Sequence, residues 1–175
     1  MTRYIRFLIQ FVLFRAGPAD APAEPRFLWA TASAAALTNF LLDNGHVDTQ
    51  TRFLFSVMQV VLLGLLLHIL LTFRKRAERW RQTAASLFGA SAMINLASWP
   101  LIMAGASEDA SRPSGPVAFV VIALTIWFLA LMARTLHLAL EIRPAFAFLI
   151  TFLCLMITGV ILLNLFPLPA PTETT

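Results

Sequence analysis

The chain has 175 residues, of which 59% are hydrophobic and only 13% are charged, and its mean hydropathy is +0.78. A soluble domain has about 25% charged residues. A soluble fold of this size also leaves about 30% of its unfolded-chain surface exposed, which is more than this composition can cover with polar groups. The composition therefore excludes an ordinary soluble domain and indicates an integral membrane protein.

The formal net charge is +4, and the sequence pI is about 10.6. In a soluble protein such a balance suggests a nucleic-acid partner. Here the basic residues lie at the ends of apolar runs, where they orient a membrane protein, so we expect no nucleic-acid partner.

Cysteine usage and known catalytic motifs exclude several kinds of site. Cys154 is the only cysteine, so an intrachain disulfide is impossible, and no Cys/His spacing typical of a metal site is present. The sequence contains no HExxH, GxSxG or Walker motif and no acidic pair of the kind that holds a catalytic metal. We therefore expect no enzyme activity, no metal and no cofactor.

The first apolar run, residues 4–14, is too short to cross a membrane, because as a helix it spans about 16 Å against a hydrocarbon core of about 30 Å. Arg3, Arg6 and Gln10 have the spacing i, i+3 and i+7, which places them on one side of that helix. We expect an amphipathic helix in the membrane interface, with its aromatic side toward lipid and its arginines toward phosphates. The alternative is a signal peptide that is cleaved after Ala21.

Five further apolar runs follow a proline-containing linker and predict an all-α bundle of five transmembrane helices. The first of these runs is short and rich in Ala, Ser and Thr, so we expect it inside the bundle, where small residues allow close packing. Pro100 is expected to kink or end the third helix. The predicted organisation is a cytoplasmic interfacial helix and linker at 1–26, a membrane domain at 27–166 with spans at about 27–42, 53–73, 83–104, 117–140 and 144–166, and a short outside tail at 167–175.

The loop between the second and third spans is a basic hairpin, residues 74–81, which contains five of the 13 Lys and Arg. Lys and Arg resist translocation and are attracted to the anionic inner leaflet, so this loop is predicted to be cytoplasmic. Five spans then place eleven of the 13 cations on the cytoplasmic side. We expect a bacterial inner-membrane protein with a cytoplasmic N-terminus and a periplasmic C-terminus. The residues expected to contact the membrane surface or a partner are Arg3, Arg6, Arg74, Lys75, Arg76, Arg79 and Arg81.

Polar side chains inside spans are costly, so each is expected to have a partner. Four of them are single amides, for which interhelical hydrogen bonds are the expected explanation. These are Asn39, Gln59, Asn95 and Asn164.

A second polar group is predicted near the cytoplasmic ends of the second and fourth spans. Arg134, His137 and Glu141 have the spacing i, i+3 and i+7 and share a helix face, and His68 has about the same depth on the second span. Three interpretations of this polar cluster remain open. In the first, Arg134 reaches lipid phosphate and Glu141 pairs with Arg143 or the hairpin. In the second, the cluster is a proton or anion site. In the third, His68 and His137 hold a b-type haem.

The layout resembles that of the YIP family, which are Rab-interacting membrane proteins with bacterial relatives. The likeness consists of the five predicted spans, the short amphipathic N-terminal stretch and the cytoplasmic turn between spans two and three. Arg81-Gln82-Thr83 leading to Asn95-Leu96-Ala97-Ser98-Trp99-Pro100 is similar to the family's third span, and Ile126-Trp127-Phe128-Leu129-Ala130-Leu131 is similar to its fourth. The family's long soluble N-terminal region and the Tyr-Gly-Pro motif of its eukaryotic members are absent, so no functional residue is transferred. The resemblance implies a non-enzymatic membrane protein that contacts partners or lipids.

These features predict a scaffold or an accessory subunit of a membrane complex. It would contact anionic lipid headgroups and either a membrane-protein partner or a second copy of itself. The alternatives are a small transporter or proton-linked subunit that uses the polar cluster, and a b-type haem carrier.

Overall fold

The structure is a computed structural model that describes residues 2–42, 48–105 and 115–166. Within these ranges the chain is all-helical, with no strand. Its helices are α1 (Thr2–Val12), α2 (Pro25–Leu42), α3 (Thr49–Phe73), α4 (Trp80–Gly105), α5 (Gly115–Leu140) and α6 (Pro144–Leu165), with short 3₁₀ turns η1 (Pro18–Asp20) and η2 (Ala77–Arg79). Three segments lie outside the described residues. They are the sequence Asp43-Asn44-Gly45-His46, which is typical of a turn, the predicted outside loop with Glu108, Asp109 and Arg112, and the tail predicted at 167–175.

Each predicted helix is present at close to its predicted position. The short helix expected at 4–14 is α1, and the five predicted spans correspond in order to α2 through α6. Among the described residues, three helices are long and apolar enough to cross a membrane, namely α3, the part of α5 from Val117 to Leu140, and α6. The protein is therefore a helical membrane protein on the composition of these three helices, whereas α2 and α4 do not reach the same apolar character.

Pro100 was expected to kink or end its helix, and the second of these outcomes is wrong. The α4 helix does not end at this proline but continues to Gly105. A proline removes one backbone donor from a helix, and a long helix tolerates this loss when the surrounding turns keep their own hydrogen bonds.

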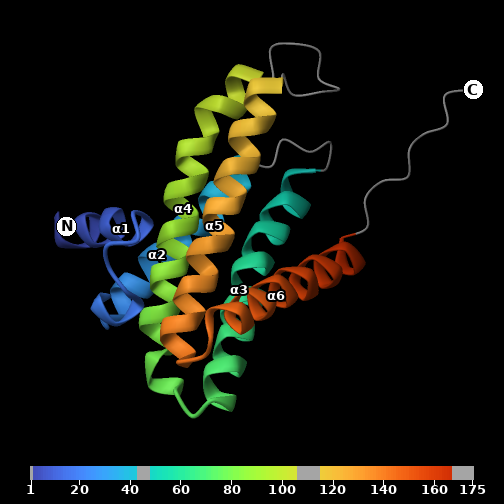
Figure 1. Cartoon of the computed structure of the whole chain (residues 1–175). Coiled ribbons are helices and arrows are strands. Elements are labelled where there is room, and N and C mark those ends of the chain that lie inside the picture. Colours follow the sequence, from blue (N-terminus) through green and yellow to red (C-terminus); the bar gives the residue numbers. More distant parts are fainter. Residues whose placement is uncertain (1, 43–47, 106–114, 167–175) are drawn as a thin grey trace, which may run out of the picture.

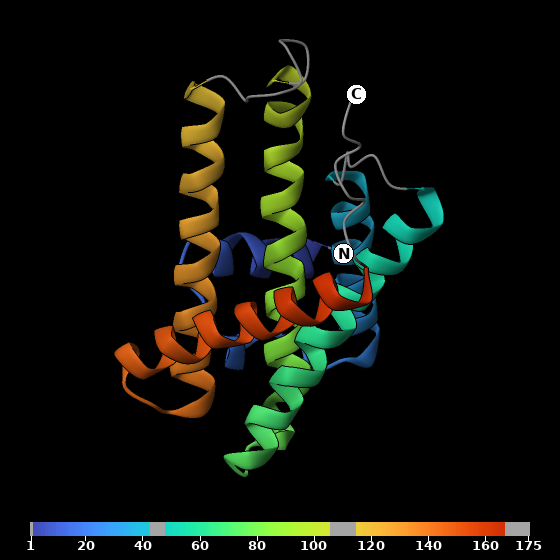
Figure 2. The same cartoon turned by 90° about the vertical axis from the view of Figure 1, so that its right-hand side faces the viewer.

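The arrangement in space is a bundle with one helix laid across each of two opposite faces. In Figures 1 and 2, α4 and α5 run side by side, and α2 and α3 complete the group. On one side α1 crosses this group, and on the opposite side α6 runs obliquely across it. Contacts between α2 and α4, and between α5 and α6, are the most extensive between helices.

The core of the molecule lies around the first half of α4. Every residue from Thr83 to Ala90 is buried there, and α1, α2, α3 and α5 all pack against α4. Two small residues of α2, Thr31 and Ala35, are buried in the same region, whereas Trp29 and Leu37 of that helix are exposed. Small residues of α2 do lie on its packed side, but the prediction that this helix lies inside the bundle is wrong, because its other side faces outward.

Gly89 explains how α1 and α2 both come close to α4. A Cβ atom at this position would lie 2.3 Å from Cδ2 of Leu8 in α1 and 3.2 Å from Cγ2 of Thr31 in α2. The absence of a side chain at Gly89 therefore allows the crossing of α1 over the bundle.

Candidate functional site

The basic hairpin is a compact turn that is hydrogen-bonded to α3 near both of its ends. Lys75 has a positive φ of 56°, and the backbone N–H of Arg76 donates to the carbonyl of Leu71 at 2.7 Å, which ends α3. At the start of α4, the indole Nε1 of Trp80 donates to the carbonyl of Gly64 at 2.9 Å. The cationic side chains are thus carried on a backbone that is held in one conformation.

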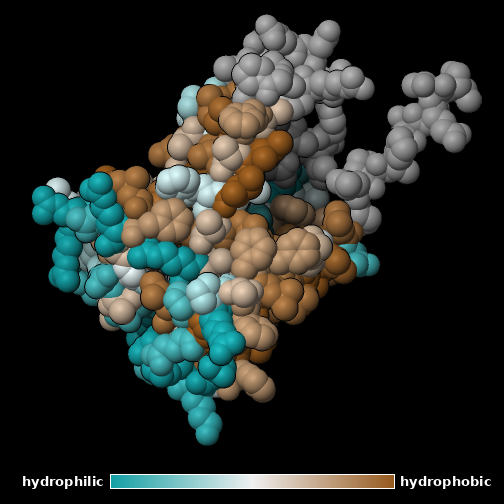
Figure 3. Space-filling view, in the orientation of Figure 1, coloured by the Kyte–Doolittle hydropathy of each residue, from teal (hydrophilic) through white to brown (hydrophobic). Residues whose placement is uncertain are grey.

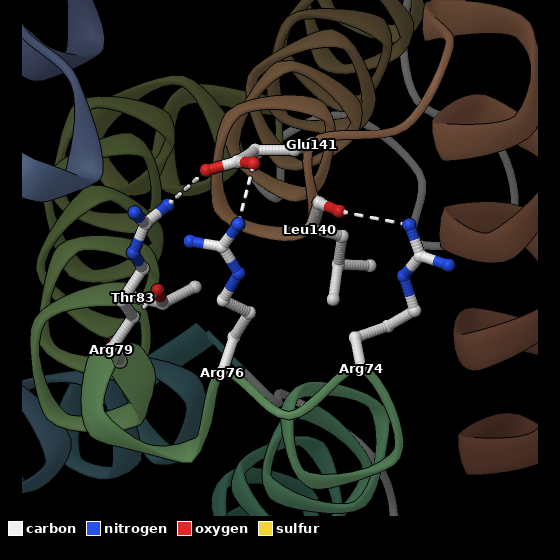
Figure 4. A network of polar contacts seen from close by, with 6 residues as sticks. All are labelled: Arg74, Arg76, Arg79, Thr83, Leu140 and Glu141. Atoms are coloured by element: carbon white, nitrogen blue, oxygen red, sulfur yellow. Dashed lines mark hydrogen bonds and ion pairs between the residues drawn. The ribbon is translucent and has the colours of Figure 1, made fainter.

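Glu141 connects the turn between α5 and α6 to this hairpin. Its carboxylate accepts from Nη2 of Arg76 at 2.6 Å and from Nη1 of Arg79 at 3.0 Å, as Figure 4 shows. Glu141 itself has a positive φ of 54°, so an L side chain occupies a left-handed position that favours glycine. The prediction that Glu141 pairs with the hairpin is confirmed, and Arg76 and Arg79 are its partners.

Arg134, a second member of the predicted polar cluster, turns toward the N-terminal segment. Its Nη1 donates to the carbonyl of Ala16 at 3.2 Å, and its guanidinium lies 5.6 Å from the centre of the Phe14 ring. The indole Nε1 of Trp127, on the same helix, donates to the carbonyl of Val12 at 3.0 Å. These contacts hold the chain that follows α1 against α5.

The two histidines have separate surroundings. His68 is exposed on α3, and its ring meets Trp80 edge to face with centroids 5.4 Å apart. His137 is half-buried on α5, where its Nδ1 contacts the carbonyl of Ile142 in the turn before α6. The four side chains predicted as one cluster therefore have four different sets of partners.

The N-terminal helix packs through its aromatic side on the protein rather than on lipid. Phe7 and Phe11 are buried, and Tyr4 stacks on Phe27 of α2 with ring centroids 5.0 Å apart. The Tyr4 hydroxyl donates to Glu24 at 2.6 Å, and this hydrogen bond raises the pKa of Tyr4. The aromatic side was expected to face the membrane, and that orientation is wrong because α2 and α4 offer it an apolar surface.

The outer surface of α1 still has two distinct strips. Arg3 and Arg6 are exposed along one strip, and next to it lie the exposed side chains of Ile5, Ile9 and Leu13. Figure 3 shows hydrophilic residues gathered over the outer side of α1 and over the end of the molecule that carries the hairpin. This combination of an aliphatic strip beside arginines suits the boundary between lipid tails and headgroups.

The predicted intramembrane amides form a connected group across three helices. Asn39 of α2 donates to Gln59 of α3 at 3.2 Å, and Asn95 of α4 donates to Asn39 at 2.5 Å and to Thr38 at 3.4 Å. The expectation of interhelical hydrogen bonds is confirmed for these three amides. It is wrong for Asn164, which donates to the carbonyl of Val160 in its own helix.

Some residues of this region carry contacts that sequence reasoning missed. Gln82 donates to the carbonyl of Ala21 at 3.0 Å, which ties the linker to α4, and Leu8 fills the space above Gly89. Ala85 and Gly89 form a pair of small residues four positions apart, a pattern that favours close packing but does not identify the partner helix. Within the described residues, no group of three or more His, Cys, Asp or Glu could hold a metal ion.

Comparison with protein-family models, with curated proteins and with solved structures gives no match to this chain.

Proposed function

We propose that the chain is a five-span scaffold or accessory subunit of the bacterial inner membrane, with the N-terminus and the hairpin on the cytoplasmic side. It contacts a partner membrane protein and anionic lipid through two surfaces. The first is the outer side of α1, with Arg3 and Arg6, and the second is the basic hairpin. No enzymatic step is assigned to it, and the likeness to the YIP family remains part of this proposal.

The proposal rests mainly on how the polar side chains divide between the inside and the surface. The interior amides bond to one another across α2, α3 and α4, which is a structural use of polar groups. In contrast, five of the cations are exposed on the surface of α1 and the hairpin, where anionic lipid adds roughly 1 kcal/mol per basic residue, namely Arg3, Arg6, Arg74, Lys75 and Arg81. An arrangement of this kind supports binding at the membrane surface more than passage through the bundle.

The burial of α4 supports five spans rather than three. A helix that other helices surround does not contact lipid tails, so its residues need not be as apolar as those of a peripheral span. In α4, Thr83 and Ser86 are buried within the protein and each hydroxyl donates to a carbonyl of the preceding turn. With α4 and α2 as spans, the cations of α1 and of the hairpin fall on one side.

The topology is tested by replacing Arg74, Lys75 and Arg76 with Gln. Removing three positive charges from the hairpin weakens the signal that keeps it inside, so we expect α3 and α4 to insert poorly or in the opposite orientation. Reporter fusions placed after α3 and after α5 measure this. An unchanged reporter pattern argues against the proposed orientation.

The partner is tested by mass spectrometry of what co-purifies with the tagged chain in mild detergent. We expect a stoichiometric membrane protein with the wild type, much less of it with Arg3→Gln/Arg6→Gln, and an unchanged amount with Gln10→Ala, which alters the same side of α1 without removing charge. A preparation that contains only lipid contradicts the accessory-subunit proposal.

The transport alternative predicts a different result from the same protein. If the polar cluster carries protons or anions, His137→Phe abolishes a flux measured in vesicles, whereas the scaffold proposal expects partner capture to persist. A haem carrier would show a Soret band that His68→Ala and His137→Ala each remove. The separate partners of these side chains favour structural positions for them.

A further inference from the structure

A groove on the far side of the hairpin from α1 has two features of a lipid site. It has a volume of about 520 Å³ and lies between the end of α3, the turn before α6 and the first turns of α6. Its lining includes Leu70 and Phe73 of α3, Phe146 and Ile150 of α6, and the two arginines Arg74 and Arg143. The groove thus joins an apolar wall to a charged rim.

The rim of the groove is positively charged. Arg74 and Arg143 line it, and in the described part of the chain neither guanidinium forms an ion pair. Glu141 also lines it, but its carboxylate is held by Arg76 and Arg79, which offset its charge. Figure 4 shows that Arg74 lies apart from this ion-pair group, with its one marked contact a 3.4 Å hydrogen bond to the carbonyl of Leu140. An anion at the rim would therefore meet uncompensated charge.

The wall of the groove is apolar and open. Phe73 is 87% exposed and Phe146 is 59% exposed, although both lie within one or two turns of the charged rim. Aromatic and aliphatic side chains from α3 and α6 therefore form one apolar surface that begins next to the arginines. Its dimensions and composition suit a hydrocarbon chain, since apolar area removed from water contributes favourably to binding.

We propose that this groove binds one phospholipid with an anionic headgroup, with its phosphate at Arg74 and Arg143 and an acyl chain along Phe73 and Phe146. Guanidinium groups bind phosphate through charge-assisted hydrogen bonds, and two of them on different elements fix its position. The inference rests on the proposed function, because it assigns a defined site to the anionic lipid that was expected only along the surface. It predicts that lipid also stabilises the contact between α3 and α6.

Native mass spectrometry with phosphatidylglycerol and phosphatidylcholine of the same chain length tests the site. We expect the wild type to bind a first phosphatidylglycerol more tightly than a first phosphatidylcholine. Arg74→Gln/Arg143→Gln should lower the affinity for phosphatidylglycerol roughly tenfold or more and remove the preference. Arg15→Gln/Arg26→Gln is the matched control, because it removes the same charge from two exposed residues outside the groove, the hairpin and α1, and it should change the first binding event by less than about twofold.

A second variant separates the wall from the rim. Phe146→Ala should weaken the binding of both lipids by a similar factor and leave the preference between them unchanged, and it removes no charge on which topology depends. Wild-type affinity in the groove double variant, or equal losses in the two double variants, would overturn the site. Equal losses of lipid affinity in the two double variants would contradict the groove but would be compatible with the general attraction of anionic lipid in the proposed function. Failure of the wild type to co-purify with a partner would contradict the proposed function but not the groove.

Discussion

The α4 and α6 helices are similar in length but are built for different surroundings. Between Thr83 and Ala90, α4 is buried on all sides and consists mainly of small or hydroxylated residues. In α6, large apolar side chains such as Phe148, Leu149, Phe152 and Leu153 are exposed. The helix with the greater apolar content lies at the edge of the molecule, and the less apolar one lies at its centre.

This difference shows what hydropathy measures in a membrane protein. A peripheral helix must match lipid tails, so large apolar residues cover it, whereas a central helix must match other helices, which favours small residues and satisfied hydroxyls. The α6 helix passes as a candidate span on composition, and α4 does not. A search for spans based on apolar character alone therefore does not select α4, the helix on which α1, α2, α3 and α5 pack.

The largest expected effect comes from adding a side chain to one glycine of each helix. Gly89→Leu in α4 places atoms where Leu8 and Thr31 already lie, so we expect a loss of roughly 1–3 kcal/mol in the free energy of unfolding. Gly159→Leu in α6 meets no described atom within 4 Å of its Cβ, and higher helix propensity should stabilise it by up to about 1 kcal/mol. Unfolding in mixed micelles measures both.

The same pair of variants tests the crossing of α1. A leucine side chain at position 89 displaces Leu8 from α4. Limited proteolysis should therefore cut α1 faster in Gly89→Leu than in the wild type or in Gly159→Leu. Equal proteolysis of all three proteins would mean that α1 does not lie over Gly89.

A smaller effect is expected from the amides of the two helices. Asn95→Ala in α4 removes hydrogen bonds to Asn39 and Thr38, and we expect a loss of roughly 0.6–1.7 kcal/mol. Asn164→Ala in α6 removes only a bond within its own helix, so its free energy of unfolding should change by about 0.5 kcal/mol or less. The comparison fails if Asn164→Ala costs as much as Asn95→Ala, measured in the same micelles.

The smallest effect concerns Glu141, which lies in the turn before α6 and pairs with two arginines of the hairpin before α4. Its ion pairs are half-exposed, so Glu141→Gln should cost about 0–1 kcal/mol. Glu141→Gly loses the same pairs but relieves the positive φ, so it should be about 1 kcal/mol more stable than Glu141→Gln. If Glu141→Gly proves less stable than Glu141→Gln, backbone strain at position 141 does not contribute significantly to the free energy of unfolding.

The bounds of the helices could be predicted well because local signals mark them. Long apolar runs ended by Arg, Glu or Pro predicted α3, α5 and α6, and the spacing of Arg3, Arg6 and Gln10 predicted an amphipathic α1. These features depend on neighbouring residues in the chain, which is the information that periodicity contains.

The contacts between helices could be predicted only in part, since they depend on how each helix is rotated and tilted. Asn39, Gln59 and Asn95 were expected to bond between helices, and they do so because burial leaves them few other partners. The prediction that Arg134, His137 and Glu141 share one helix face is wrong for Glu141, which follows the end of α5 and has a positive φ. Each of the three side chains reaches a different neighbouring segment. Equal depth along two helices predicts that side chains are at the same level, but it does not predict that they face one another.

The measurement that tests this account most directly is photolabelling of the protein with a carbene probe dissolved in the lipid phase. If α4 is the central helix, residues 83–90 should remain almost unlabelled while residues 148–157 of α6 are labelled strongly at their exposed side chains. Strong labelling of residues 83–90 would place α4 against lipid and contradict the packing on which the proposed five-span scaffold rests.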